Sequence, residues 1–135
     1  MIFVDPNIFM YAGGRPHPHK APSASWLRRV AVGELEAVTD AEVLQEILHR
    51  YRSLRRWREG GALFDLARRI VPVVLPVTVA TLELARLQLE MHDSLDARDA
   101  DHLAVCQLNG IEKICSYDRD FDPVEGFERI EPRPV

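Results

Sequence analysis

A chain of 135 residues has room for one domain with a single hydrophobic core, here residues 1–135. Apolar residues make up 47% of it and charged residues 28%, which is typical of a soluble globular protein. The net charge of −4 argues against a protein that binds nucleic acid through its overall charge, and no apolar run approaches the roughly 20 residues that span a membrane.

Nothing at the N-terminus looks like a signal peptide, because Asp5 and Pro6 interrupt the first apolar stretch almost at once. The only cysteines, Cys106 and Cys115, lie in apolar segments. We therefore expect two buried, reduced thiols and a cytoplasmic protein.

Short apolar runs alternate with helical patterns along the chain. The runs predict strands at 2–4, 37–39, 73–75 and 114–116, with a fifth edge strand at 129–131. The helices are expected at 8–11, from Ser23 or Ser25 to about 32, at 41–51, 57–70, 78–92 and 97–108. Strands that alternate with helices predict an α/β fold with a central parallel sheet of four to five strands flanked by helices.

Two helices carry additional signals. Thr39 and Glu42 have the spacing of a capping box, which would begin the helix at 41–51. The apolar stripe of the helix at 78–92 is wider than one core face requires, so we expect a second buried face and a subunit contact in a homodimer.

Carboxylates follow two of the predicted strands. Asp5 comes directly after the first strand, and Asp118 follows the strand that ends at Ser116. The carboxyl ends of parallel strands are where open α/β sheets build their sites. An acid at the end of a buried strand is costly unless it is paired, so both are candidate site residues.

Each helical candidate has a neighbour that competes with it. Glu42 and Glu46 share a helix face; Glu42 is explained by the capping box, so Glu46 is preferred. Asp99 lies in a first helical turn, and Asp101 lies about 200° around the helix from it, so only one can face the site. Asp99 is preferred, with Asp96 as the N-cap.

Four carboxylates in close range cannot all ionise comfortably without a cation. Oxygen ligands, with no competing Cys and His set, select Mg²⁺ or Mn²⁺; whether one or two ions bind is open. The direct ligands are expected to be Asp5, Asp99 and Asp118, with Glu46 either a ligand or a holder of water. Asp120 is expected to orient the turn or to support these acids.

Arginines gather in the middle of the chain. Seven fall between Arg50 and Arg69, against only Glu59 and Asp65. A basic face beside an acidic centre is a plausible arrangement for binding a polyanion near a metal. The candidate contacts to a phosphate backbone are Arg15, Arg52, Arg55, Arg56 and Arg119.

Four short motifs, in order, resemble the PIN domain, most closely the VapC-type toxins of toxin–antitoxin pairs. They are Asp-x-Asn at 5–7, Glu-Ile-Leu at 46–48, Asp-Ala-x-His-Leu-Ala at 99–104 and Ser-x-Asp-Arg-Asp-Phe at 116–121. The resemblance spans nearly the whole chain, although Pro6 stands where the family often has Thr or Ser.

The resemblance implies a PIN-like three-layer sandwich and a metal-dependent ribonuclease. The family's acids map onto Asp5, Glu46, Asp99 and Asp118, its polar residue near the first acid onto Asn7, and its hydroxyl residue onto Ser116. It also implies an RNA substrate, an antitoxin partner and a homodimer.

Two other functions compete with this interpretation. A phosphatase with a nucleophilic Asp5 would require a second acid at position 7, where this chain has Asn7. A non-catalytic PIN-shaped module that binds RNA or protein would not require all four acids, and all four are present.

Overall fold

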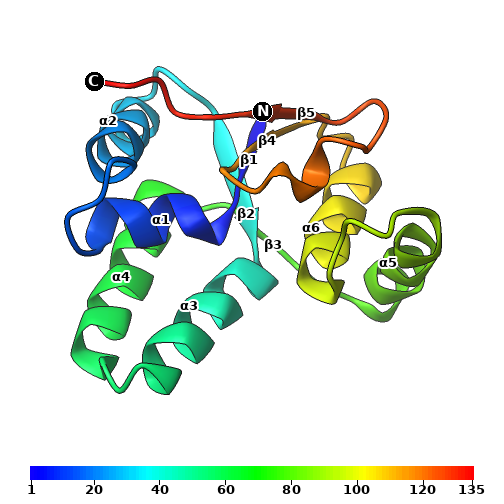
Figure 1. The fold of residues 1–135 in the computed structure, drawn as a ribbon, viewed down its shortest axis with the longest axis horizontal. Coiled ribbons are helices and arrows are strands. Elements are labelled where there is room, and N and C mark those ends of the chain that lie inside the picture. The colour runs from blue at the N-terminus through cyan, green and yellow to red at the C-terminus, as the bar shows by residue number, and fades with distance from the viewer.

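Five strands form one fully parallel sheet in the order β3-β2-β1-β4-β5, and helices cover both of its faces (Figure 1). The computed structural model describes all 135 residues. The elements in chain order are β1 (Ile2–Val4), α1 (Pro6–Gly13), α2 (Lys20–Ala31), β2 (Ala37–Asp40), α3 (Ala41–Ser53), α4 (Trp57–Ile70), β3 (Val74–Leu75), α5 (Val79–Met91), α6 (Ala97–Leu108), β4 (Lys113–Cys115), the 3-10 helix η1 (Arg119–Phe121) and β5 (Glu128–Ile130).

This architecture confirms the predicted α/β fold with its parallel sheet and its edge strand near residue 129. Helices α1 to α4 lie on one side of the sheet, and α5 and α6 lie on the other (Figure 1). The helices pack in pairs, α1 with α2, α3 with α4 and α5 with α6. None of them is both long enough and apolar enough to cross a membrane.

The strand order places a switch point at the middle of the sheet. The chain runs from β1 through β2 to β3 on one side, and then returns to add β4 and β5 on the other. In such sheets the crevice forms outside the carboxyl ends of the two strands where the order reverses. Here these strands are β1 and β4, which lead into Asp5 and Ser116.

The core consists of apolar side chains from the strands and from the inner faces of the helices. Phe3, Val4, Ile114 and Cys115 on the adjacent strands β1 and β4 are fully buried, and Cys106 of α6 belongs to the same core. Each such aliphatic or aromatic side chain contributes about 1.5–3 kcal/mol by leaving water. Both cysteines are buried and unpaired, as the sequence predicts.

One predicted helix start and one predicted N-cap are wrong. Helix α2 begins at Lys20, after His19, and not at Ser23 or Ser25. The N-cap of α3 is Asp40, whose side chain accepts a hydrogen bond from the Val43 amide at 2.8 Å.

The hydroxyl of Thr39 does not cap α3, because it donates to the carbonyl of Val4 across the sheet. Glu42 therefore has no capping role, and the reason the sequence offered for preferring Glu46 does not hold.

The wide apolar stripe of α5 is only partly covered by the chain. Its Ala85 and Gln88 are buried, whereas Val79, Leu82 and Met91 are 72%, 50% and 70% exposed. A homodimer therefore stays a prediction, for which α5 offers an uncovered apolar face.

Candidate active site and metal centre

Asp5 lies at the switch point, and its carboxylate is held rather than free. It is the N-cap of α1 but makes no capping hydrogen bond. Its Oδ2 accepts hydrogen bonds from Asn7 Nδ2 at 2.9 Å and from the hydroxyl of Ser116. The side chain is buried, and this burial raises the pKa of Asp5 to about 7, although His102 and Ser116 lower it.

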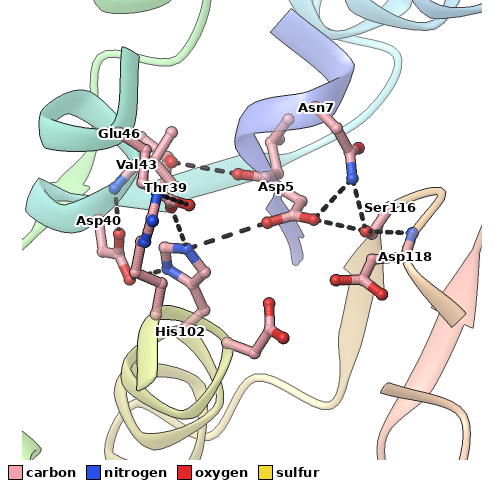
Figure 2. Close-up of polar contacts among 12 residues, drawn as sticks. Asp5, Asn7, Thr39, Asp40, Val43, Glu46, His102, Ser116 and Asp118 are labelled. Carbon is pink, nitrogen blue, oxygen red and sulfur yellow. Dashed lines mark hydrogen bonds and ion pairs between the residues drawn. The ribbon is translucent and has the colours of Figure 1, made fainter. Parts of the chain in front are cut away.

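Ser116 joins the ends of β1 and β4. While its hydroxyl donates to Asp5, its oxygen accepts from Asn7 Nδ2 at 3.2 Å and from the Asp118 amide at 2.9 Å. A hydroxyl has one proton and two lone pairs, so its capacity for hydrogen bonds is filled. Figure 2 shows this arrangement, in which Asp118 faces the same space as Asp5. The predicted supporting residues Asn7 and Ser116 thus fix the first acid relative to the last.

Asp99 approaches from α6. Its Oδ2 accepts from the Asp96 amide at 3.2 Å, and Asp96 accepts from the Asp99 amide at 2.8 Å, which forms a capping box. Asp96 is therefore the N-cap, as predicted. Burial, together with the charges of Asp118, Asp96 and Asp5, raises the pKa of Asp99 to about 8.

The preferred acids line one cleft. Its volume is about 360 Å³, and its walls include Asp5, Glu46, Asp99 and Asp118. Neither Asp101 nor Glu42 lines it; Glu42 lines an adjoining hollow that shares Glu46, His49 and Arg98 with the cleft. The structure thus brings together the four acids selected from the sequence and leaves their two competitors outside.

Asp120 lies closer to the acids than its predicted supporting role required. One carboxylate oxygen from each of Asp99, Asp118 and Asp120 lies within 4.8 Å of the others. Asp120 also donates its amide to Asp118 Oδ1 at 2.9 Å, which orients that carboxylate. Three convergent carboxylates, with Asp5 beside them, form a set of hard oxygen donors that fits a divalent cation. Burial is the main cause of the raised pKa values of Asp5 and Asp99, and the neighbouring carboxylates add to it, so a bound cation would lower both.

Glu46 is oriented from behind by a buried histidine. His102 Nε2 lies 2.7 Å from Glu46 Oε2, and His102 Nδ1 lies 2.8 Å from Asp40 Oδ2 (Figure 2). His102 is 1% exposed and Asp40 is fully buried. Burial opposes protonation of His102, but Asp40, Glu46 and Asp5 raise its pKa well above the usual value. A protonated imidazole between two carboxylates satisfies both of them.

Sequence reasoning missed the roles of His102 and Asp40. His102 stands in the Asp-Ala-x-His-Leu-Ala motif, where only the first residue was assigned a role. Asp40 ends β2, so the rule that selected Asp5 after β1 would also have selected it.

The candidate phosphate-binding arginines lie outside the acidic cleft. Arg15 and Arg56 line a neighbouring pocket, while Arg52, Arg55 and Arg119 are exposed. Two arginines that were not singled out, Arg50 and Arg98, do line the cleft. Arg98 lies 3.6 Å from Glu46 and helps to balance the acids.

Comparisons with known proteins agree with this geometry. The family model for the PIN domain matches residues 2–126. Ribonuclease VapC13 of Mycobacterium tuberculosis is 42% identical over 130 residues, which cover 96% of this chain and 99% of that protein.

Solved structures match as well. The structure of VapC20 from M. tuberculosis, described as a toxin that cleaves the sarcin-ricin loop, superposes with a TM-score of 0.74 at 25% identity, covering 91% of this chain and 94% of that one. A toxin–antitoxin complex from Klebsiella pneumoniae shares the fold, with a TM-score of 0.68 at 14% identity and full coverage of both chains. This chain therefore belongs to the PIN-domain family and, within it, to the VapC ribonucleases.

Proposed function

We propose that this protein is the toxin of a toxin–antitoxin pair and hydrolyses RNA phosphodiester bonds with Mg²⁺ or Mn²⁺ held by Asp5, Asp99 and Asp118. The observation that carries the proposal is that these acids and Glu46 line one cleft at the sheet's switch point. When bound, the cation supplies charge neutralisation at the scissile phosphate and lowers the pKa of the attacking water.

Residues around the acids hold Asp5 and Glu46 in fixed orientations. Ser116 and Asn7 hold the Asp5 carboxylate in one orientation through hydrogen bonds to Oδ2. His102 and Arg98 hold the two oxygens of Glu46, so that Glu46 faces the cleft in a fixed position. In that position Glu46 either completes the ligand set or orients the water that attacks phosphorus.

Cationic side chains compensate the charge of the substrate. Arg50 and Arg98 border the acids and can contact the phosphates on either side of the scissile bond. Farther out, Arg52, Arg55 and Arg119 are exposed and extend the basic surface. Contacts of this kind give affinity without reading sequence.

The competing phosphatase is less compatible with this site. A nucleophilic Asp5 would need a carboxylate free to attack phosphorus, whereas one oxygen of Asp5 is engaged by both Asn7 and Ser116. The side chain is also buried against His102, at 3.9 Å.

An antitoxin partner and a homodimer belong to the same proposal. The matching toxin–antitoxin complex supports the first. The exposed apolar side chains Val79, Leu82, Leu87 and Met91 on α5 support the second, since such a face is a candidate contact for another copy of the chain.

The experiment is cleavage of a labelled single-stranded RNA by the purified protein with Mg²⁺, with Mn²⁺ and with excess chelator. We expect cleavage only with metal, and none from Asp118→Asn. The matched control is Asp101→Asn, which changes an acid outside the cleft and should retain activity. Full activity in chelator would overturn the metal assignment, and an inactive wild type with both metals would favour the non-catalytic module.

A further inference from the structure

A second pocket adjoins the acidic cleft and has a different character. Its volume is about 380 Å³, within the range of small-ligand sites. It shares Asn7, Met10 and Arg50 with the cleft, so the two hollows are continuous. No carboxylate lines it, whereas three arginines do: Arg15, Arg50 and Arg56. We call it the aromatic pocket, because Tyr11, His17 and Tyr51 also form its walls.

The rings at this pocket are held in place before any ligand arrives. Tyr11 lies 4.6 Å from His17 and packs edge-on against His19 and Tyr117, at 5.0 Å and 5.4 Å between centroids. His19 and Tyr117 are stacked at 3.7 Å with 9° between their planes. A flat ligand that stacks on Tyr11 would therefore order few additional side chains, which lowers the entropic cost of binding.

The same ring cluster is tied directly to the candidate catalytic residues. Tyr117 lies between Ser116 and Asp118 in the chain, and its amide donates to Asn7 Oδ1 at 3.4 Å. The face of Tyr11 and the Asp5–Asp118 pair are thus fixed relative to each other. A group that binds against Tyr11 is therefore held at a fixed distance from a phosphate that binds at the acids.

The charges around the pocket favour one class of ligand. Aromatic faces with arginines beside them bind bases of single-stranded nucleic acid, because every base has a π-face and every nucleotide a phosphate. Arg56 is paired with Glu59 and lies 5.9 Å from the Tyr51 ring, so it is positioned at the wall, whereas Arg50 lies on the boundary with the acidic cleft.

We propose that the aromatic pocket is a subsite for one unpaired RNA base next to the scissile phosphate, stacked on Tyr11. This inference rests on the ribonuclease function proposed above and adds a reason for that enzyme to prefer single-stranded RNA: a paired base must first be unpaired and unstacked before it can enter the pocket, and an unpaired base avoids that cost. It also assigns a role in binding to Tyr11 and His17, which do not line the acidic cleft.

The test measures equilibrium binding in chelator, where cleavage does not interfere. The probes are a fluorescent single-stranded RNA and the same oligonucleotide with its central bases removed, which keeps the phosphates. Tyr11→Leu should weaken binding of the intact RNA by roughly 5- to 150-fold, the range for the loss of one stacked base. It should leave the abasic RNA nearly unchanged, and Tyr11→Phe should retain binding of both.

Two further variants are needed: a control outside the pocket and a second change at its wall. Trp57→Leu removes an exposed aromatic side chain that does not line the pocket, and it should not alter the affinity ratio of intact to abasic RNA. His17→Ala changes an exposed ring at the pocket wall, so it tests the subsite even if Tyr11→Leu fails to fold. It should lower the ratio in the same direction as Tyr11→Leu.

The outcomes separate the subsite from the ribonuclease function. If the wild type cleaves RNA but both variants bind intact RNA like the wild type, the base subsite is wrong and the nuclease stands. Equal weakening of intact and abasic RNA would mean that the pocket contacts phosphates only. If the variants keep RNA binding and instead lose a protein partner, the pocket is a protein-docking surface and the proposal falls. A wild type that neither binds nor cleaves RNA overturns both.

Discussion

His102 Nε2 lies 2.7 Å from the Glu46 carboxylate, and the opposite ring nitrogen lies 2.8 Å from Asp40. The three side chains come from α6, α3 and the end of β2, so the network joins both layers of helices to the sheet. With His102 only 1% exposed, its protonated ring is the main counter-charge of two acids. The position of Glu46 in the cleft therefore depends on a residue that does not face the substrate.

Replacing His102 with Asn should destabilise the protein by about 3–5 kcal/mol, because Asp40 and Glu46 lose their buried cationic partner. Urea unfolding measures this loss. The control is Asp101→Asn on the neighbouring residue, which should stay within about 0.5 kcal/mol of wild type. A loss below about 1 kcal/mol for His102→Asn would show that the network is not held together by an ion pair.

Glu46→Gln should abolish cleavage while binding of the single-stranded RNA is retained, because the change removes a charge from the cleft and leaves the basic surface intact. Glu42→Gln should retain activity, since Glu42 does not line the cleft that holds the other acids. The measurement is the cleavage rate of each variant with Mg²⁺ at saturating RNA. An inactive Glu42→Gln beside an active Glu46→Gln would reverse the assignment.

Helices α3 and α4 approach each other through a glycine. A Cβ on Gly60 would lie 2.4 Å from the Cβ of Tyr51, whereas a Cβ on Gly61 would meet nothing within 4 Å. Gly60→Ala should thus cost about 1–3 kcal/mol by overpacking, and Gly61→Ala should gain about 0.5–1 kcal/mol through helix propensity. Thermal or urea unfolding of both variants checks these opposite signs. If the two substitutions changed the free energy of unfolding equally, α3 and α4 would be able to move apart without loss of stability.

The sheet, and the acids that line the cleft, could be selected from the sequence because each leaves a local signal. A buried run that ends in an acid is visible in β1 and after β4, and the N-cap at Asp96 follows from its spacing to Asp99. The N-cap of α3 was harder to predict, because Thr39 and Asp40 are both residues that cap helices well. The choice depends on the hydrogen bond of Thr39 to Val4, a residue 35 positions away in the sequence.

The parts of the site that were missed depend on contacts between distant segments. His102 and Glu46 are 56 positions apart, and His102 and Asp40 are 62 apart. No periodicity in the sequence reports that a histidine on the inner face of one helix meets an acid on another. The aromatic pocket has the same origin, since Tyr11 and Tyr117 meet only after β1 and β4 have paired.

In chelator, the stability of the protein should fall as the pH rises from about 4 to 8. Asp5 and Asp99 have folded pKa values of about 7 and 8, against 3.8 as the ordinary value, so over this range the folded state binds more protons than the unfolded chain. The raised pKa of His102 adds to the fall above about pH 6.5. Urea unfolding at four pH values measures the slope. Stability that rises over the same range would contradict the burial of these acids and the neighbouring charges that together raise their pKa values.

Asp99→Asn tests the same convergence with a single residue. The variant replaces the acid with a neutral amide and keeps an oxygen that can accept the Asp96 amide, so the capping box survives. With a pKa of about 8, Asp99 must hold a proton in the folded state at neutral pH in chelator, whereas the unfolded chain releases it, and Asn avoids this cost. The variant should therefore be more stable than the wild type under these conditions, by at least about 1 kcal/mol, because each unit by which folding raises a pKa is worth about 1.4 kcal/mol. Millimolar Mg²⁺ should raise the melting temperature of the wild type by binding to the folded state, and that of the variant much less. If Asp99 served only the helix dipole, the variant would instead lose about 0.3–1 kcal/mol and metal would act on both proteins alike. Thermal melts of the two proteins, with chelator and with Mg²⁺, distinguish these opposite signs.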